Sequence, residues 1–551
     1  MSPYPTGGEA LADALDAAGV RHVFTIASVH NLPILDAIRR RTAIDVITMR
    51  HEQGVVHAAD GYARASGGVG VAIVSTGPGT ANAMGGLFEA VSACSSVLLV
   101  TGQNERRRAT RRAGMLHDAP RQTEMLDSIT RGTWTVAPSD DVAAVVRAAV
   151  ARTRGPLPGP AVIEMPIDVQ YGPVATPAPA ATEFAPAAPV NRDAVTRAAA
   201  LLAEAARPLV VAGGGVVRSG AADRLTALAE RLDAPVLTSV EGRGSVREDH
   251  RLSIGSTATT PRMRELIGAA DVVVAVGTHF RELWTGGWTI PAPARLVHVD
   301  IDPGVLGLTY PTEVAIAGDA GTVLDELLTA LPDGPAADRA SWLEQADRAA
   351  DDMRSVLLAR IGPDHEAIMR TVRDVLPEDA PLVRDSTVPA YAWGDSLLPV
   401  LVPGTSMRPV SAAIGPGLPL AVGAAVAAGS RAVAICGDGG ILLSIGELAV
   451  LSQRQLPVTV CVFNDGCFGV LKGIQEATFD GPPSDVELNA PDFVALARSF
   501  GVPASLARSA EAFAEQFAAA AHTEGPHLIE IDLHALEPIR IPYGSGAPAQ
   551  V

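Results

Sequence analysis

Residues 432–469 read AVAICGDGGILLSIGELAVLSQRQLPVTVCVFNDGCFG. The stretch contains two short runs, residues 432–436 and 458–463, that are apolar on both faces and rich in β-branched side chains. Such runs are typical of strands that are covered on both sides. The residues between them have helical periodicity, and we expect a helix that begins near Leu443. A strand, a helix and a second strand in this order predict a parallel sheet with helices on both faces.

The same alternation of apolar runs and Ala-rich helical stretches recurs in the rest of the chain. VGVAIVS and SVLLVTG flank one helical stretch near the N-terminus, and PLVVAG and PVLTS flank another in the middle. Two Ala/Pro-rich segments, residues 172–189 and 331–341, favour extended and solvated backbone, so we expect them to be linkers. We therefore predict an α/β protein with three doubly wound parallel-sheet domains, over residues 1–171, 190–330 and 350–551.

The composition argues against nucleic acids and membranes as partners. The 551 residues carry 43 Lys+Arg against 61 Asp+Glu, a net charge of −18, and only 4% of them are aromatic. An acidic surface repels phosphate backbones and anionic lipids, and the basic cluster RRRATRR at residues 106–112 is short, so we expect no nucleic-acid partner. We also expect no membrane partner, because the long uncharged stretches, residues 65–88 and 409–430, are interrupted by Gly or Pro.

The cysteines and the first residues bear on the compartment. The chain has four cysteines and no CxxC pair, which predicts a reducing compartment without disulfides. The N-terminal residues MSPYPTGGEALADALDAAG lack a basic region followed by an apolar run, so no signal peptide is expected. These features favour a cytoplasmic protein.

Oxygen-bearing side chains follow two strands that are expected to be neighbours. Asp438 comes directly after the first strand of the opening stretch, and Asn464 and Asp465 come directly after the second. The carboxyl ends of parallel strands meet at one edge of the sheet, where ligands bind. Carboxylates and a main-chain carbonyl suit a hard cation, Mg²⁺ or Ca²⁺, and glycines let the backbone approach a diphosphate. The alternative is that GDGG is only a strand-to-helix turn.

The spacing of GDG and the Asn-Asp pair resembles the metal-binding motif of thiamine diphosphate (ThDP) enzymes, and the surrounding sequence resembles the acetohydroxyacid synthase, benzoylformate decarboxylase and benzaldehyde lyase group. The resemblance implies that Asp438, the side chain at 465 and the Cys467 carbonyl hold Mg²⁺. The chain departs from the family pattern because Asp465 stands where the family has a second Asn, and Asn464 is the alternative ligand. The remaining residues that the resemblance places at the diphosphate are Gly437, Gly439, Gly440, Phe468 and Gly469.

Four segments between Arg50 and Gln103 resemble the pyrimidine-binding domain of the same enzymes: RHEQG, GYARASG, VSTGPGTAN and VLLVTGQ. The resemblance implies that Glu52 hydrogen-bonds N1′ of the aminopyrimidine and helps to create the base that removes the proton from thiazolium C2. It also implies that Pro78 and Asn82, within the third segment, lie at the cofactor. The alternative for Glu52 is a helix cap.

Ile414, in SAAIGPGLP, stands where the family has the apolar residue that bends the cofactor. The alternative for Ile414 is an ordinary core position. In the related enzymes, two subunits grip opposite ends of the cofactor, so the resemblance implies a homodimer or homotetramer with active sites at the subunit interface.

Other residues bear on the substrate. The resemblance places His30 and Gln103 near it, with His30 as a proton relay or carboxylate ligand, although a structural histidine is the alternative. Thr387, Trp393 and residues 470–478 are expected to line the remaining wall. Val91 and SACSS at residues 92–96 replace the residues of acetohydroxyacid synthases, which weakens an acetolactate synthase assignment.

These features predict a ThDP- and Mg²⁺-dependent decarboxylase or carboligase that acts on a 2-oxo acid, with or without an aldehyde or ketone acceptor. An acetolactate synthase-type enzyme and a non-catalytic ThDP-binding relative are the alternatives. A flavin or nicotinamide oxidoreductase is a third, weaker one, because GGGVVRSG at residues 213–220 does not have the GxGxxG spacing. FAD in the middle domain is possible in this family but not favoured, because GTHFRELW replaces the flavin-associated sequence.

Overall fold

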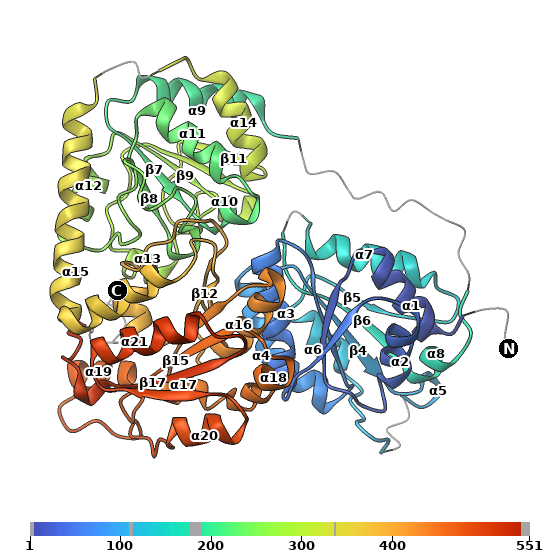
Figure 1. The fold of residues 1–551 in the computed structure, drawn as a ribbon. Helices are drawn as coiled ribbons and strands as arrows, with labels where there is room; N and C mark the ends of the chain where they lie inside the picture. Colours follow the sequence, from blue (N-terminus) through green and yellow to red (C-terminus); the bar gives the residue numbers. More distant parts are fainter. Residues whose placement is uncertain (1–4, 110–113, 156, 176–188, 335–337, 542–551) are drawn as a thin grey trace.

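The computed structural model describes residues 5–109, 114–155, 157–175, 189–334 and 338–541. Each of the three parts of the chain forms a parallel sheet flanked by helices (Figure 1), so the expected α/β fold class is confirmed. Most of the expected linker at residues 172–189, and residues 335–337 of the second one, lie outside the described residues. Within the described ranges, no helix combines the length and the apolar character needed to cross a membrane.

The N-terminal domain is built on a six-stranded parallel sheet with the order β2-β1-β3-β4-β6-β5. Every residue of β3 and almost every residue of β4 is buried, as strands covered on both faces require. The strands are β1 His22–Thr25, β2 Asp45–Thr48, β3 Gly70–Val74, β4 Val97–Gln103, β5 Thr133–Thr135 and β6 Ala161–Pro166. The helices are α1 Gly7–Ala17, α2 Leu32–Arg41, α3 Glu52–Ser66, α4 Pro78–Ser92, α5 Arg106–Ala109, α6 Gln122–Asp127, α7 Val142–Thr153 and α8 Ile167–Tyr171.

The middle domain has a five-stranded parallel sheet with the order β11-β10-β9-β7-β8. Its core consists of two apolar clusters that share the strands: α9, α11 and α14 contribute to one, and α12 and α15 (Ala340–Val375) contribute to the other. The strands are β7 Pro208–Ala212, β8 Val236–Thr238, β9 Val272–Val276, β10 Leu296–Asp300 and β11 Val314–Ala317. The helices are α9 Arg192–Glu204, α10 Gly214–Arg218, α11 Ala222–Leu232, α12 Pro261–Ala269, α13 Glu282–Thr285 and α14 Ala320–Ala330.

The C-terminal domain repeats the six-stranded arrangement, with the order β13-β12-β14-β15-β17-β16. The two strands of the opening sequence stretch, β14 and β15, are neighbours and pair in parallel. The strands are β12 Leu382–Arg384, β13 Ser406–Met407, β14 Ala432–Gly437, β15 Val458–Asn464, β16 Ala504–Ala507 and β17 His527–Asp532. The helices are α15 Ala340–Val375, α16 Gly417–Ala428, α17 Asp438–Ile441, α18 Leu448–Arg454, α19 Gly469–Thr478, α20 Phe493–Ser499 and α21 Ala510–Ala521.

The expected helix start near Leu443 is wrong. The short helix α17 already begins at Asp438, and the regular helix α18 begins only at Leu448. Between them, the amides of Leu443 and Glu447 bond to carbonyls three residues earlier, which tightens the chain into short 3₁₀-type turns. The carboxylate of Asp438 is therefore on the first turn of a short helix at the sheet edge.

The long helix α15 joins the middle and C-terminal domains (Figure 1). Its first part packs in the core of the middle domain through Trp342 and Met353, and its second part packs in the C-terminal core through Ile361 and Val372. The helix is kinked at Gly362, which has a φ of 74° and precedes Pro363. Proline lacks the N–H that a continuous helix needs, which explains the kink. The kink lies where the helix passes from the core of the middle domain to that of the C-terminal domain.

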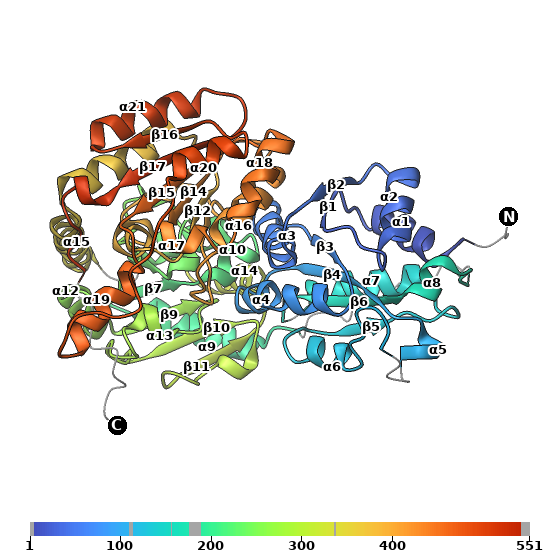
Figure 2. The same cartoon turned by 90° about the horizontal axis from the view of Figure 1, so that it is seen from below.

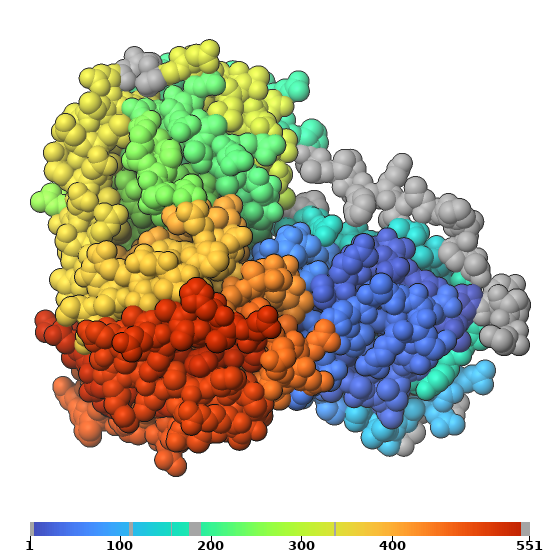
Figure 3. All heavy atoms as spheres, in the orientation of Figure 1, coloured from blue at the N-terminus to red at the C-terminus, as the bar shows by residue number. Residues whose placement is uncertain are grey.

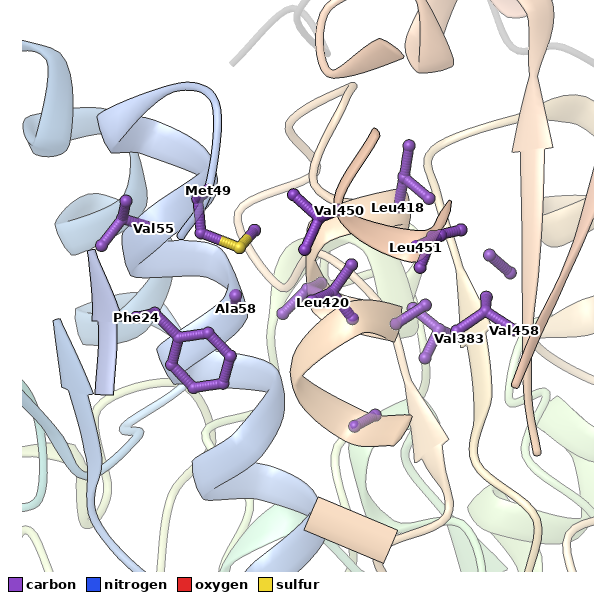
Figure 4. Packing of buried hydrophobic residues seen from close by; sticks show 14 of the residues in the cluster. Phe24, Met49, Val55, Ala58, Val383, Leu418, Leu420, Val450, Leu451 and Val458 are labelled. Carbon is purple, nitrogen blue, oxygen red and sulfur yellow. The ribbon is translucent and has the colours of Figure 1, made fainter. Parts of the chain in front are cut away.

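The N-terminal and C-terminal domains share one apolar core, formed around α3 and α16 (Figures 2 and 4). A Cβ atom on Gly61 of α3 would lie 2.1 Å from the Leu420 carbonyl oxygen, and one on Gly423 of α16 would lie 1.8 Å from the Ala58 carbonyl oxygen. Only glycine permits such a close approach of two helices. The space-filling view shows the resulting contact between the N-terminal domain and the orange part of the C-terminal domain (Figure 3).

One buried histidine of α15 makes stability depend on pH. The ring of His365 is stacked on that of Phe463 in β15, with centroids 6.3 Å apart, and its Nδ1 has no partner among the described residues. Burial lowers the pKa of His365 to about 4, although the Asp364 charge opposes the shift. Because this folded-state pKa lies below the ordinary value of 6.5, the unfolded chain binds the proton more readily between these values.

We therefore expect His365 to destabilise the fold as the pH falls from about 6.5 toward 4, by about 3 kcal/mol at the acidic end. The unfolding temperatures of the wild type and of His365→Asn, measured at a series of pH values, should draw apart in that range, with the wild type losing more. The exposed His534→Asn serves as the control. A wild-type to His365→Asn difference that stays constant with pH would contradict the assignment.

Candidate active site

A cavity of about 240 Å³ opens at the carboxyl ends of β14 and β15. Asp438 and Asp465 line it on the side of the sheet, and Ile414, Thr387 and Phe468 line other parts of its wall. This is the edge at which parallel sheets bind ligands. Asp438 and Asp465, which the sequence places after these two strands, are therefore together in one cavity, whereas Asn464 is not among the residues that line it.

Asp438 is buried, with 2% of its surface exposed, and its Oδ2 has no hydrogen-bond partner among the described residues. Burial, and after it the negative charge of Asp465, raise the pKa of Asp438 to about 7, although the main-chain amides of Gly439 and Gly466 oppose the shift. An unpartnered buried carboxylate oxygen near a second carboxylate is costly unless a cation neutralises it. The donor set therefore fits a divalent cation that takes oxygen ligands.

Asn464 is less available than Asp465. Its Nδ2 donates to Glu530 Oε1 at 2.8 Å, and its Oδ1 accepts from the Gly466 amide at 3.1 Å. Asp465 Oδ1 accepts from the Cys467 amide at 3.2 Å, and the Cys467 thiol also hydrogen-bonds the Asp465 carboxylate. No group of three or more His, Cys, Asp or Glu side chains with metal-site geometry occurs among the described residues. The expected site differs from such a group, because it uses two carboxylates and a main-chain carbonyl.

The glycines beside Asp438 leave no room for side chains. A Cβ atom on Gly437 would lie 2.7 Å from Thr387 Oγ1, and one on Gly439 would lie 2.6 Å from the ring of Phe468. On Gly469 it would lie 2.4 Å from Asp465 Oδ2. The absence of side chains at these positions therefore lets Thr387, Phe468 and Asp465 pack directly on the main chain at the edge of the cavity. Gly440, which also lines the cavity, adjoins Asp385.

Ile414 lies on a loop that two buried acids hold in place. Asp385 accepts from the main-chain amides of Gly415, at 3.0 Å, and Gly417, at 3.3 Å. Burial raises the pKa of Asp385 to about 6, against the effect of these amides. The side chain of Ile414 is 38% exposed and lines the cavity, so it is not an ordinary core position.

The second acid is Glu89 of α4, in the N-terminal domain. It accepts from the Val410 amide at 2.7 Å and from the amide and hydroxyl of Ser411 at 3.0 and 2.5 Å. Burial alone would raise the pKa of Glu89, but the Arg64 charge and the Ser411 hydrogen bonds lower it to about 2. The sequence analysis missed both acids. Asp385 had a signal, since it directly follows β12 at the same sheet edge, but Glu89 had none.

Glu52 is the first residue of α3, and the side chain of His51 caps this helix. Asn82 Nδ2 donates to Glu52 Oε2 at 3.0 Å. A Cβ atom on Gly79 would lie 3.2 Å from Oε1, so Oε1 lies against the first turn of α4, which begins at Pro78. The structure therefore brings together Glu52, Pro78 and Asn82, which the sequence analysis assigned to the pyrimidine end.

A polar cluster adjoins Glu52 through Ser75, whose Cβ would lie 2.9 Å from a Cβ on Gly79. Ser75 Oγ is 2.6 Å from Ser28 Oγ and 3.2 Å from His117 Nδ1. The ring of His117 lies 5.2 Å from that of His30, whose Nδ1 is buried without a partner among the described residues. Burial, and after it the proximity of His117, lower the pKa of His30. The sequence analysis did not identify His117.

Gln103 ends β4 in a second polar network. Its Oε1 accepts from the Asn104 amide at 2.8 Å, and its Nε2 lies 3.5 Å from Glu164 Oε1. The buried Gln122, which the sequence analysis also missed, donates to the same Glu164 oxygen at 2.8 Å. Gln103 is therefore held near the carboxyl edge of the N-terminal sheet.

The two groups of site residues lie in different domains. All residues that line the cavity belong to residues 386–533 of the C-terminal domain, and Glu52, His30 and Gln103 are not among them. Thr387 and part of residues 470–478 line the cavity as expected, but the expectation for Trp393 is wrong. Trp393 is fully buried and packs on Phe463, because burial of its large apolar ring in the core is favourable. Tyr391 lines the wall of the cavity instead.

The basic cluster lies away from this cavity. Arg106 forms an ion pair with Asp168 at 2.8 Å, and residues 110–113 of the cluster lie outside the described residues. In the middle domain, Gly213 and Gly215 pack against Gly277, so the glycines there serve a close turn. Arg281, in the GTHFRELW segment, donates to the Ser92 carbonyl oxygen at 2.7 Å and joins the two segments that depart from the family pattern.

Comparison with known proteins gives three matches along the chain. Models of the thiamine pyrophosphate enzyme N-terminal TPP binding domain, central domain and C-terminal TPP binding domain match residues 5–125, 195–327 and 390–531. A probable acetolactate synthase large subunit of Methanocaldococcus jannaschii is 32% identical over 96% of this chain and 92% of its own length. A probable 2-ketoarginine decarboxylase of Pseudomonas aeruginosa is 34% identical, over 90% of this chain and 88% of its own. An acetolactate synthase large subunit of Parasynechococcus marenigrum is 32% identical, over 96% and 87%.

Proposed function

The chain belongs to the thiamine pyrophosphate enzyme family, and on this premise we propose that it is a ThDP- and Mg²⁺-dependent decarboxylase or carboligase acting on a 2-oxo acid. The observation that carries the proposal is the cavity at the ends of β14 and β15, which combines a buried, partly unpartnered carboxylate, a second carboxylate and a glycine edge. A merely structural turn has no need of an unpaired buried charge. The four free cysteines, three of them buried, support a reducing compartment such as the cytoplasm.

Asp438, Asp465 and the Cys467 carbonyl are the residues that would hold Mg²⁺. The carboxylates supply the anionic oxygen ligands that this cation prefers. The glycines at 437, 439 and 440 would let the main chain meet the diphosphate, and Ile414 would support the bend of the cofactor. A second carboxylate at 465 in place of an amide strengthens metal binding and repels the diphosphate, so we expect cofactor binding to depend strongly on the metal.

When bound, ThDP supplies a nucleophilic carbon and an electron sink for decarboxylation. The role of the protein side chains is to hold and transfer protons. Glu52 would exchange a proton with N1′ of the aminopyrimidine through Oε1, because Oε2 is engaged by Asn82. The presence of this carboxylate opposes a non-catalytic relative, since a silent site does not need it. His30, His117 and Ser75 form the polar cluster that adjoins Glu52 through Ser75, and would bind the substrate carboxylate or relay protons.

The separation of the two groups of residues supports a homodimer in which a second copy completes each site. Glu52 does not line the cavity of its own chain. Large apolar side chains are exposed around the cavity, namely Ile414, Leu443 and Leu471, and Phe88 is exposed on α4, the helix that begins at the pyrimidine end. Exposed apolar groups of this kind mark an interface. The N-terminal domain of the partner, with its Glu52, is the occupant that fits both observations.

An acetolactate synthase-type reaction is the alternative, and the identity to two acetolactate synthase large subunits over most of the chain favours it. The residues at 91–96 argue against it, because they differ from the acetohydroxyacid synthase pattern. The proposal includes no flavin, because GTHFRELW at residues 277–284 replaces the flavin-associated sequence of the family.

The proposed function is tested with purified protein, ThDP and Mg²⁺. A panel of 2-oxo acids, offered alone and with aldehyde or ketone acceptors, should release CO₂, and mass spectrometry should identify an aldehyde or a C–C bonded product. Acetolactate from pyruvate would favour the alternative. Absence of turnover with every acid, in protein that binds ThDP, would contradict an enzyme of this class.

Glu52→Gln should keep the cofactor and lose at least about two orders of magnitude in kcat, because an amide cannot exchange the proton. Isothermal titration with ThDP and steady-state kinetics measure the two properties. An unchanged kcat would refute the role of Glu52.

The same variant also tests the shared site. When Glu52→Gln chains and Asp438→Ala chains are unfolded and refolded together, each mixed dimer contains one intact site if the two residues come from different subunits. We expect activity to return to about a quarter of the wild-type value, since about half of the dimers are mixed. The separately refolded variants are the controls. A mixture as inactive as they are would show that each site is formed within one chain.

Asp465 and Asn464 can be told apart by metal dependence. Asp465→Ala should raise the Mg²⁺ concentration for half-maximal activity by about tenfold or more, because a charged ligand is lost. Asn464→Ala, which removes the contacts with Glu530 and Gly466, should raise it far less. Activity measured across a Mg²⁺ series after chelation gives both values. The opposite order would identify Asn464 as the ligand.

A further inference from the structure

Glu447 of the C-terminal domain binds the main chain of the N-terminal domain directly before Glu52. It lies on the 3₁₀ turn between α17 and α18, and only 1% of its surface is exposed. Its carboxylate accepts from the Arg50 amide, at 3.3 and 3.2 Å, and from the His51 amide, at 3.2 Å. These are the last two residues before α3 begins at Glu52.

The surroundings show that the contact is with the main chain alone. The Arg50 side chain turns away and donates to Thr48 and Met49 carbonyls and to Gln453 Oε1. A Cβ atom on Gly54 would lie 2.3 Å from Glu447 Oε1, so no side chain fits between the carboxylate and the first turn of α3. Glu447 therefore constrains the path of the backbone.

Burial of the Glu447 carboxylate disfavours its charged form. Burial raises the pKa of Glu447 to about 7, although the amides of Arg50 and His51, and then the Arg50 charge, oppose the shift. Among the described residues, no Arg or Lys forms an ion pair with it, in contrast to Glu89, which is paired with Arg64. A buried acid that is satisfied mainly by two amides is well suited to fixing where those amides lie.

We propose that Glu447 is a positioning residue, which fixes the start of α3 so that Glu52 Oε1 lies at the distance and angle needed for proton exchange with the pyrimidine. The inference rests on the proposed function, because it assigns Glu52 that task. The carboxylate of Glu52 is held by the hydrogen bond from Asn82. The backbone of Glu52 is held by Glu447, which binds the amide of the preceding residue, His51. A displacement of about 1 Å at a catalytic group costs about a hundredfold in rate.

The test compares Glu447→Ala and Glu447→Gln with a matched control, Gln453→Ala. Gln453 belongs to the same interface, but it accepts a hydrogen bond from the Arg50 side chain, at 2.7 Å, and not from the main chain before Glu52. The first readout uses the protein without cofactor, namely amide hydrogen exchange in a peptide that covers residues 50–53. We expect faster exchange in Glu447→Ala, an intermediate rate in Glu447→Gln, which keeps one acceptor oxygen, and no change in Gln453→Ala.

The second readout is the rate of hydrogen–deuterium exchange at C2 of bound ThDP, followed by NMR after acid quench. In Glu447→Ala we expect the C2 exchange rate and kcat to fall together by about 10- to 100-fold. The Kd for ThDP should change by less than about threefold. In Gln453→Ala we expect both rates to be unchanged. If Glu447→Ala does not fold, the same readouts on Glu447→Gln and Glu447→Asp decide. A wild-type C2 exchange rate, or a loss explained wholly by weaker cofactor binding, would overturn the positioning role.

Glu52→Gln separates this inference from the proposed function. If C2 exchange is normal in Glu52→Gln, the proposed role of Glu52 fails. If C2 exchange is lost in Glu52→Gln and normal in the Glu447 variants, only the positioning role fails.

Discussion

The close contact between α3 and α16 is the constraint on which the rest of the structure depends. The helices approach so closely that the carbonyl oxygens of Ala58 and Leu420 occupy the space of side chains at Gly423 and Gly61. One apolar core therefore runs through both domains instead of ending at each sheet. Interiors of this density deform little, so the distance between the N-terminal and C-terminal sheets is set by main-chain contact. The two parts of the chain that carry the site chemistry are fixed relative to each other for this reason.

This contact lets each domain hold the site loop of the other with a buried acid. Glu447 of the C-terminal domain binds the amides before Glu52, and Glu89 of the N-terminal domain binds the amides before Ile414. The electrostatics of the two acids differ. The Arg64 charge helps to lower the pKa of Glu89 to about 2, whereas burial raises that of Glu447 to about 7. Both acids accept from main-chain amides and so fix backbone positions, and Glu89 also accepts from the Ser411 hydroxyl.

Much of the fold and part of the site could be predicted from the sequence, because both follow local rules. Apolar runs that alternate with helical stretches indicate parallel sheets, and polar residues directly after buried strands, such as Asp438 and Asp465, must lie at the same sheet edge. The helix start near Leu443 and the wall position of Trp393 could not be predicted well. Two features depend on the packing around them: the 3₁₀-type turns that follow α17, and the burial of Trp393 where Tyr391 lines the cavity.

The sequence by itself determined which residue types lie at the ends of the strands. Hydrophobic periodicity and the residues that end a strand or helix are properties of neighbouring residues in the chain. It determined Glu52 at a helix start and Asp438 directly after a buried strand. The tertiary structure alone decided which acids hold the site together. Asp385, Glu89 and Glu447 act on amides 30 or more residues away. Such partners are set by how closely whole helices and sheets pack, and no local pattern of side chains encodes that distance.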